Sequence, residues 1–181
     1  LALKDLTDAI TRAATDDRIK GMVLSGSGFG GGMAQLMAVE KALKEFKESG
    51  KPIVSYAENY TQGEYILKSL STKLFLNPNG GVDLKGLATQ MPFYKGFLEK
   101  YGIDVQIFRV GKFKSAVEPY METKMSEANR EQNLRMLESV WDTISTIIAE
   151  NRGLSHADVC AAAATRTGMF PQEALGAGLV D

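Results

Sequence analysis

Short apolar runs that alternate with amphipathic stretches constrain the fold of this chain more than any other feature of its sequence. Between the runs, apolar residues recur every three or four positions, which is the period of a helix. Alternation of strands and helices favours an α/β fold with a mostly parallel sheet, because parallel neighbours need a crossover connection. The runs that predict strands are 19–24, 51–57, 73–78 and 104–110.

Helical periodicity also fills the remainder of the chain. From Ser126 onward the pattern is almost entirely helical, and it predicts one long amphipathic helix that ends near Gly153. Ser155 and Asp158 have the spacing of a capping box, which marks the start of the next helix. The other predicted helices are 2–15, 33–49, 61–72, 94–102, 156–164 and 171–175. With 181 residues and no segment that reads as a linker, we expect one domain over 1–181.

Composition excludes several classes of function. The chain has 21 basic and 22 acidic residues, so it lacks the basic excess typical of nucleic-acid binding. Its single cysteine, Cys160, excludes an internal disulfide and a metal site built from cysteines. No apolar stretch is long enough to cross a bilayer. The chain begins at Leu1, within a predicted helix and without Met, so we expect it to be a fragment of a longer protein.

A glycine-rich turn follows the first predicted strand and precedes a predicted helix. Gly26, Gly28 and Gly31 fit the G-x-G-x-x-G pattern of dinucleotide-binding folds, and Glu58 is the nearest candidate for the acidic residue that holds the ribose. A second interpretation is that backbone N–H groups of the turn stabilise the oxyanion of an acyl-transfer intermediate. A third is a connection that binds no ligand.

Two residues outside the turn are candidates for chemistry. Thr61 stands at the start of a predicted helix, where it suits an N-cap, and where a developing alkoxide would also be favoured. Lys114 follows a predicted strand and the turn residue Gly111, so it can point back into a cleft and act as a general base if it is desolvated. Lys112 suits the surface better.

Three segments resemble the signal peptide peptidase A, or protease IV, family of serine proteases. They are "KALKEFKESGKPIVSYAENYTQGEYILKS", "VGKFKSAVEPY" followed by "MSEANRE", and the closing "GMFPQEALGAGLVD". The resemblance covers nearly the whole chain and is to the N-terminal half of the long, two-domain form. It implies a ClpP/crotonase-like fold, built of repeated ββα units with a mostly parallel sheet and a helical C-terminal part.

The resemblance also implies a role for each candidate residue. Lys114, in the G-x-x-K-S-A motif, would be the general base of a Ser/Lys dyad, and the serine would come from the C-terminal domain of the same protein. Thr61 occupies the nucleophile's place but departs from the catalytic "A-S-G-G-Y" pattern, and the Gly30, Gly31 and Gly32 turn corresponds to the oxyanion turn. We therefore expect this fragment to be inactive alone.

For the whole protein, the resemblance implies a membrane-associated endopeptidase that degrades cleaved signal peptides on the periplasmic side of the membrane. It implies homo-oligomers, no cofactor, and an extended peptide paired with strand edges near Asn77–Gly81 and Gly86–Gln90. A Ser/Lys dyad needs no histidine, and His156 is expected to be exposed and without a partner. Alternatives are a non-catalytic oligomerisation or peptide-binding domain, a nucleotide-binding domain, and acyl-CoA chemistry.

Overall fold

The chain folds into two compact units, one formed by Leu1–Gly86 with Ile144–Asp181 and the other by Leu87–Thr143. The structure is a computed structural model that describes residues 2–26, 30–108, 110–111, 114–165 and 168–181. Whether the two units form a single domain, as expected from the sequence, stays a prediction. Within the described residues no helix has both the length and the apolar character needed to cross a membrane.

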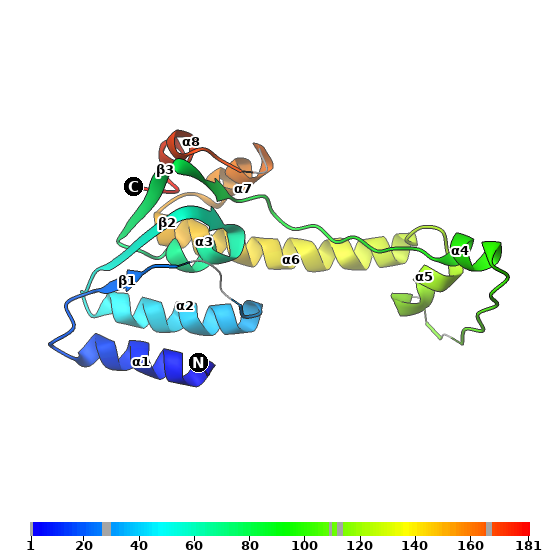
Figure 1. Cartoon of the computed structure of the whole chain (residues 1–181), viewed down its shortest axis with the longest axis horizontal. Coiled ribbons are helices and arrows are strands. Elements are labelled where there is room, and N and C mark those ends of the chain that lie inside the picture. The colour runs from blue at the N-terminus through cyan, green and yellow to red at the C-terminus, as the bar shows by residue number, and fades with distance from the viewer. Residues whose placement is uncertain (1, 27–29, 109, 112–113, 166–167) are drawn as a thin grey trace. The chain divides into compact units, whose positions relative to one another are not determined.

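A parallel sheet organises the first unit (Figure 1). Its strands lie in the order β1, β2, β3, with Met22 paired to Ile53 and Ser55 paired to Leu74. Their bounds are β1 Met22–Leu24, β2 Ile53–Thr61 and β3 Lys73–Asp83. The predicted α/β class with parallel strands is therefore confirmed.

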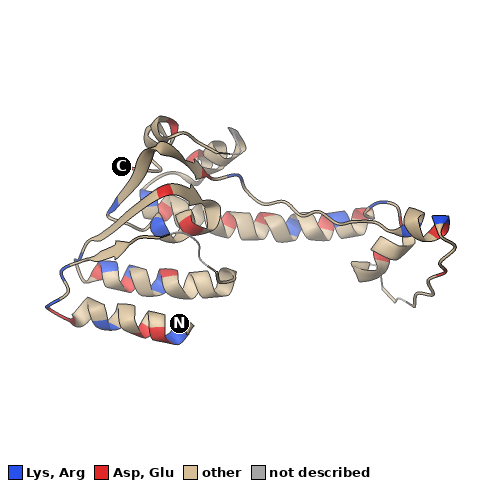
Figure 2. Cartoon of the chain, viewed as in Figure 1, with Lys and Arg blue, Asp and Glu red and all other residues tan. Residues whose placement is uncertain are grey.

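Amphipathic helices cover this sheet and supply most of its core. Helices α1 and α2 lie side by side (Figure 1), and basic and acidic residues are interspersed along both (Figure 2). Phe46 of α2 and Ile148 of α6 are fully buried, as are Ile53 and Leu74 of the sheet. The helices of this unit are α1 Leu3–Thr15, α2 Met33–Glu48, α3 Gln62–Lys68, the part of α6 (Glu127–Arg152) from Ile144 onward, α7 His156–Thr165 and α8 Pro171–Gly176.

The second unit holds short helices and extended segments. They are α4 Lys95–Lys100, a 3₁₀ turn at Ser115–Val117, α5 Glu118–Met121 and the part of α6 up to Thr143. The prediction of a strand over 104–110 is wrong for the residues that the structure describes there, 104–108 and 110. An isolated strand is not stable without a neighbour to share its hydrogen bonds, and Phe108 and Val110 are exposed.

The backbones of β2 and β3 approach so closely at Gly80 that no side chain fits at this position. The pairing of β2 with β3 shifts register between Ala57 and Asn59. At this irregularity, a Cβ atom on Gly80 would lie 1.6 Å from the carbonyl oxygen of Glu58. A side chain at position 80 would therefore force the two strands apart.

We expect Gly80→Ala to lower the free energy of unfolding by about 3 kcal/mol, because the strands must separate to admit a methyl group. The matched control is Gly63→Ala in α3, where a Cβ atom meets no atom within 4 Å. That change should raise stability by about 0.5–1 kcal/mol, since alanine favours a helix. Urea unfolding of both variants measures the difference, and equal midpoints would contradict this assignment.

Candidate active site

Thr61 is both the last residue of β2 and the N-cap of α3. Its hydroxyl donates to Oε2 of Glu64 at 2.9 Å, and its backbone N–H donates to the same oxygen at 3.4 Å. The N-cap prediction for Thr61 is confirmed. Because its hydroxyl proton is held by a carboxylate, the side chain is engaged in the cap, and its correspondence to a nucleophile's position stays a prediction.

A buried ion pair lies directly beyond this cap. Glu64 and Lys68 stand one helical turn apart on α3, with 3.3 Å between Oε1 and Nζ, and their side chains are 4% and 9% exposed. The Lys68 ammonium also donates to the carbonyl oxygen of Gly26 at 2.6 Å and lies over the ring of Tyr60. Burial, reinforced by the charge of Glu64, raises the pKa of Tyr60. Lys68 thus ties α3 to the start of the glycine turn.

The described part of the glycine turn leads into α2. A Cβ atom at Gly30 or Gly32 would meet no atom within 4 Å, so space is open beside the backbone. However, the N–H of Gly32 already donates to Oε1 of Gln35 at 2.9 Å. An oxyanion could use that N–H only after the Gln35 amide had moved away. Gly28 of the dinucleotide pattern lies outside the described residues, and the role of the Gly31 N–H stays a prediction.

A cavity of about 800 Å³ has Thr61 in its wall, together with Gly80 and Met169. Two smaller cavities adjoin Thr61, Glu64 and Lys68. One, of about 380 Å³, lies beside Ser25, Gly26, Thr61 and Glu64. The other, of about 400 Å³, is mostly apolar and has Glu64 and Lys68 in its wall. The structure therefore brings Thr61 and Gly26, the first glycine of the turn, to one hollow of the first unit. That Gly30, Gly31 and Gly32 form an oxyanion turn stays a prediction.

Lys114 belongs to the second unit, whereas Thr61 and the glycine turn belong to the first. It immediately precedes the 3₁₀ turn at Ser115–Val117, and its backbone N–H donates to the carbonyl oxygen of Gly111 at 3.4 Å. Its side chain is exposed, so the shelter that a neutral amine requires is not provided by the described residues of this unit. Lys112 lies outside the described residues, and the base role of Lys114 stays a prediction.

His156 has a partner that the sequence did not reveal. Its Nε2 lies 2.8 Å from the Oγ of Ser145, and the Sγ of Cys160 lies 3.8 Å from the ring. The expectation that His156 is exposed is confirmed, but the expectation that it lacks a partner is wrong. Ser145 is eleven positions away on another helix, and no periodicity predicts that contact.

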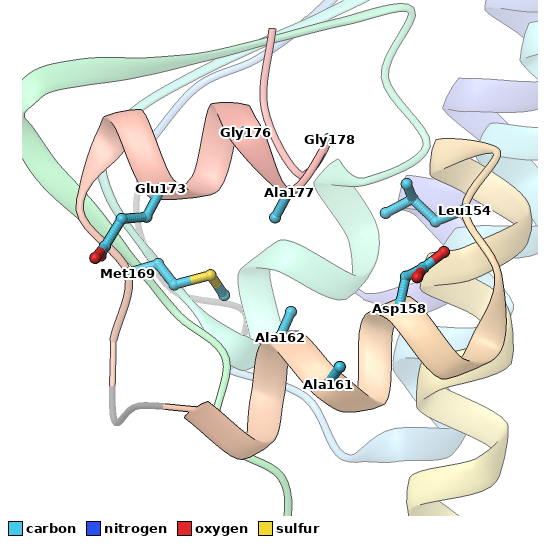
Figure 3. Close-up of a pocket in the computed structure, with 9 residues that line it drawn as sticks. All are labelled: Leu154, Asp158, Ala161, Ala162, Met169, Glu173, Gly176, Ala177 and Gly178. Carbon is cyan, nitrogen blue, oxygen red and sulfur yellow. The ribbon is translucent and has the colours of Figure 1, made fainter.

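A cavity of about 700 Å³ between α7 and α8 contains none of the predicted site residues (Figure 3). Its wall consists mainly of small and apolar residues, together with Asp158 and Glu173. Asp158 accepts hydrogen bonds from Ser155 and so caps α7, and Glu173 accepts the N–H of Phe170 at the start of α8. These two carboxylates therefore act as helix caps.

Comparison with known proteins adds evidence independent of this geometry. Residues 45–181 match the model of peptidase family S49. The chain is 41% identical to Protease 4 of Salmonella typhi and 38% identical to Protease 4 of Haemophilus influenzae, over 85% and 83% of its length. It is 31% identical, over 88% of its length, to a protein of Arabidopsis thaliana named Serine protease SPPA, chloroplastic. The chain spans about a quarter of the length of these relatives.

Proposed function

Because this chain belongs to peptidase family S49, we propose that it is the N-terminal domain of a serine endopeptidase that works with a Ser/Lys dyad. One observation carries the proposal: similarity to proteins named Protease 4 extends over more than four fifths of this chain but over only a quarter of theirs. The remaining length of such a protein is where the nucleophilic serine would lie.

In this mechanism the neutral amine of Lys114 takes the proton from the serine hydroxyl as its oxygen attacks a peptide carbonyl. The lysine then gives that proton to the amine that leaves. Two features of the first unit support the proposal that the general base and the nucleophile come from different domains. The hydroxyl of Thr61 is held by Glu64, and the N–H of Gly32 is held by Gln35. The active hydroxyl is therefore proposed to come from another domain, which would also cover the amine of Lys114.

The proposed substrates are cleaved signal peptides, bound in an extended conformation. Such a peptide would add its backbone to the edge of β3 near Asn77–Gly81. The other expected edge, Gly86–Gln90, is wrong, because β3 ends at Asp83 and those residues form no strand. The proposed setting is the periplasmic side of a membrane, in a homo-oligomer. These proposals follow from the resemblance of nearly the whole chain to the signal peptide peptidase A family.

A second candidate is a non-catalytic domain that oligomerises and binds peptides. The exposure of Lys114 favours it. The two candidates differ in whether peptide hydrolysis by the whole protein depends on Lys114.

We expect the 181-residue chain alone to hydrolyse no fluorogenic peptide, because Thr61 is engaged in a cap. The same chain joined to the C-terminal domain should turn the peptide over and react once with a serine-directed fluorophosphonate. Thr61→Ala, measured in both forms, is the control and should change neither rate. Steady turnover by the 181-residue chain that is lost in Thr61→Ala would contradict the proposal.

A further inference from the structure

The interior of the second unit is polar. Among its described residues only two side chains are buried, those of Glu118 and Asn129, which are 1% and 2% exposed. Several large apolar side chains of this unit lie at the surface instead, and Phe108 and Val110 are 94% and 92% exposed. Burial of a carboxylate is costly unless hydrogen bonds compensate for the lost water. The burial of Glu118 and Asn129 therefore cannot be explained by apolar packing and must depend on hydrogen bonds.

Hydrogen bonds from the start of α6 surround the Glu118 carboxylate. The hydroxyl of Ser126 donates to Oε1 at 2.6 Å, and the amide of Asn129 donates to Oε2 at 2.9 Å. The backbone N–H of Ser126 also donates to Oε2, at 3.3 Å. Asn129 is fixed in turn by Asn133, whose amide donates to its Oδ1 at 2.6 Å. The carboxylate is thus held from two sides by the first turns of one long helix.

Glu118 lies at the end of the short segment that carries Lys114. Lys114 immediately precedes the 3₁₀ turn at Ser115–Val117, and α5 begins directly afterwards at Glu118. Two more contacts hold the same segment: the carbonyl oxygen of Pro119 accepts the N–H of Tyr94 at 2.6 Å, and the rings of Tyr94 and Tyr120 stack with centroids 5.8 Å apart. Of these attachments, the Glu118 carboxylate is the buried one.

We propose that Glu118 is a positioning residue: its buried carboxylate fastens the 3₁₀ turn to the start of α6 and thereby fixes the backbone from which Lys114 extends. The proposal rests on the proposed role of Lys114 as the general base. Buried polar groups that are fully hydrogen-bonded specify one geometry more sharply than apolar contacts do. A general base must meet its proton within hydrogen-bond reach, and a displacement of about 1 Å can cost a hundredfold in rate.

The first test measures hydrogen exchange in the 181-residue chain. Glu118→Gln keeps the size of the side chain but replaces one carboxylate oxygen with an NH₂ group. That group faces a hydrogen-bond donor of Ser126 or Asn129 and cannot accept from it. We expect amides of residues 114–121 to exchange about tenfold faster, with β2 and α2 unchanged. The matched control is Glu122→Gln, an exposed carboxylate on the next turn, which should change nothing. Ser126→Ala should reproduce the effect of Glu118→Gln in residues 114–121, and Ser126→Thr, which keeps the hydroxyl, should restore protection.

The second test measures kinetics in the whole protein, with active sites counted by fluorophosphonate labelling. Glu118→Gln should lower kcat about tenfold and leave KM unchanged within about twofold, whereas Glu122→Gln should alter neither. The positioning role would be contradicted if Glu118→Gln had the same hydrogen exchange and the same kcat as Glu122→Gln. It would also be contradicted if Glu118→Gln lost protection from exchange throughout both units. Lys114→Ala separates the two proposals. Full activity of Lys114→Ala would contradict the role of Lys114 as the general base. If Lys114→Ala is inactive but Glu118→Gln has normal activity, only the positioning role of Glu118 is contradicted.

Discussion

Lys114→Ala should lower kcat of the whole protein by about a hundredfold or more and leave KM within about twofold. A positioned general base contributes a factor of about 10²–10⁴. No described histidine or second amine shares the 3₁₀ turn with Lys114, so no neighbour in that turn replaces it. Because the lysine acts on the serine proton and not on the bound peptide, the loss belongs in kcat.

The matched control is Lys124→Ala, which removes another exposed amine from the same unit. Its activity should equal that of the unmodified protein, since a solvated lysine has no part in proton transfer. Initial rates with a fluorogenic peptide, normalised to labelled serine, provide the measurement. Peptidase activity that survives Lys114→Ala would favour the non-catalytic candidate and remove the basis of the proposed mechanism.

Lys68→Ala should lower the free energy of unfolding by about 3–5 kcal/mol, the largest stability effect that we expect in the first unit. The change removes the cation from a buried ion pair, and the loss of one member of such a pair costs about that much. It also removes the donor at 2.6 Å from the carbonyl oxygen of Gly26. Guanidinium unfolding, followed by circular dichroism, measures the loss.

An exposed pair of the same type is the control for Lys68. Lys4 and Asp8 on α1 also stand four residues apart, but their side chains are 80% and 49% exposed. Lys4→Ala should change stability by less than about 0.5 kcal/mol, because water screens the pair. The double change Lys68→Met with Glu64→Gln should recover part of the loss, since no unpaired charge remains. Equal effects of Lys68→Ala and Lys4→Ala would show that the buried pair has no special role.

The sequence predicts the helical end of the chain well and the sheet less well. In α6 the apolar residues keep their period from Leu134 to Ile148, and Gly153 follows, so the C-terminal end of the helix is evident from the sequence. Strands β2 and β3 run on to Thr61 and Asp83, beyond the predicted ends. The extension of β3 contains Gly80 and Gly81, which are typical of turns. Pairing with β2 on one side and with Met169 at Val82 keeps it extended. The opposite error occurs at 104–110, where an apolar run has no strand beside it.

In the candidate active site, too, the sequence predicts local contacts but not contacts with distant segments. Thr61 is followed by Glu64 at the spacing of a capping box, so its cap is predictable. The Glu64–Lys68 pair was missed, although a signal exists: a glutamate and a lysine four residues apart flank Tyr65, Ile66 and Leu67. Three apolar residues between opposite charges indicate a buried turn. The buried state of Glu118 has no such signal, because its partners lie in a different helix.

The polar interior of residues 87–143 has a calorimetric consequence. The heat capacity of unfolding rises mainly with the apolar surface that becomes exposed to water. The described residues of that unit bury no apolar side chain, whereas the first unit buries Phe46, Ile53, Leu74 and many others. A calorimetric scan of the chain would therefore report almost entirely on the unfolding of the sheet and its helices. Local unfolding of residues 114–121 would scarcely change the measured heat capacity.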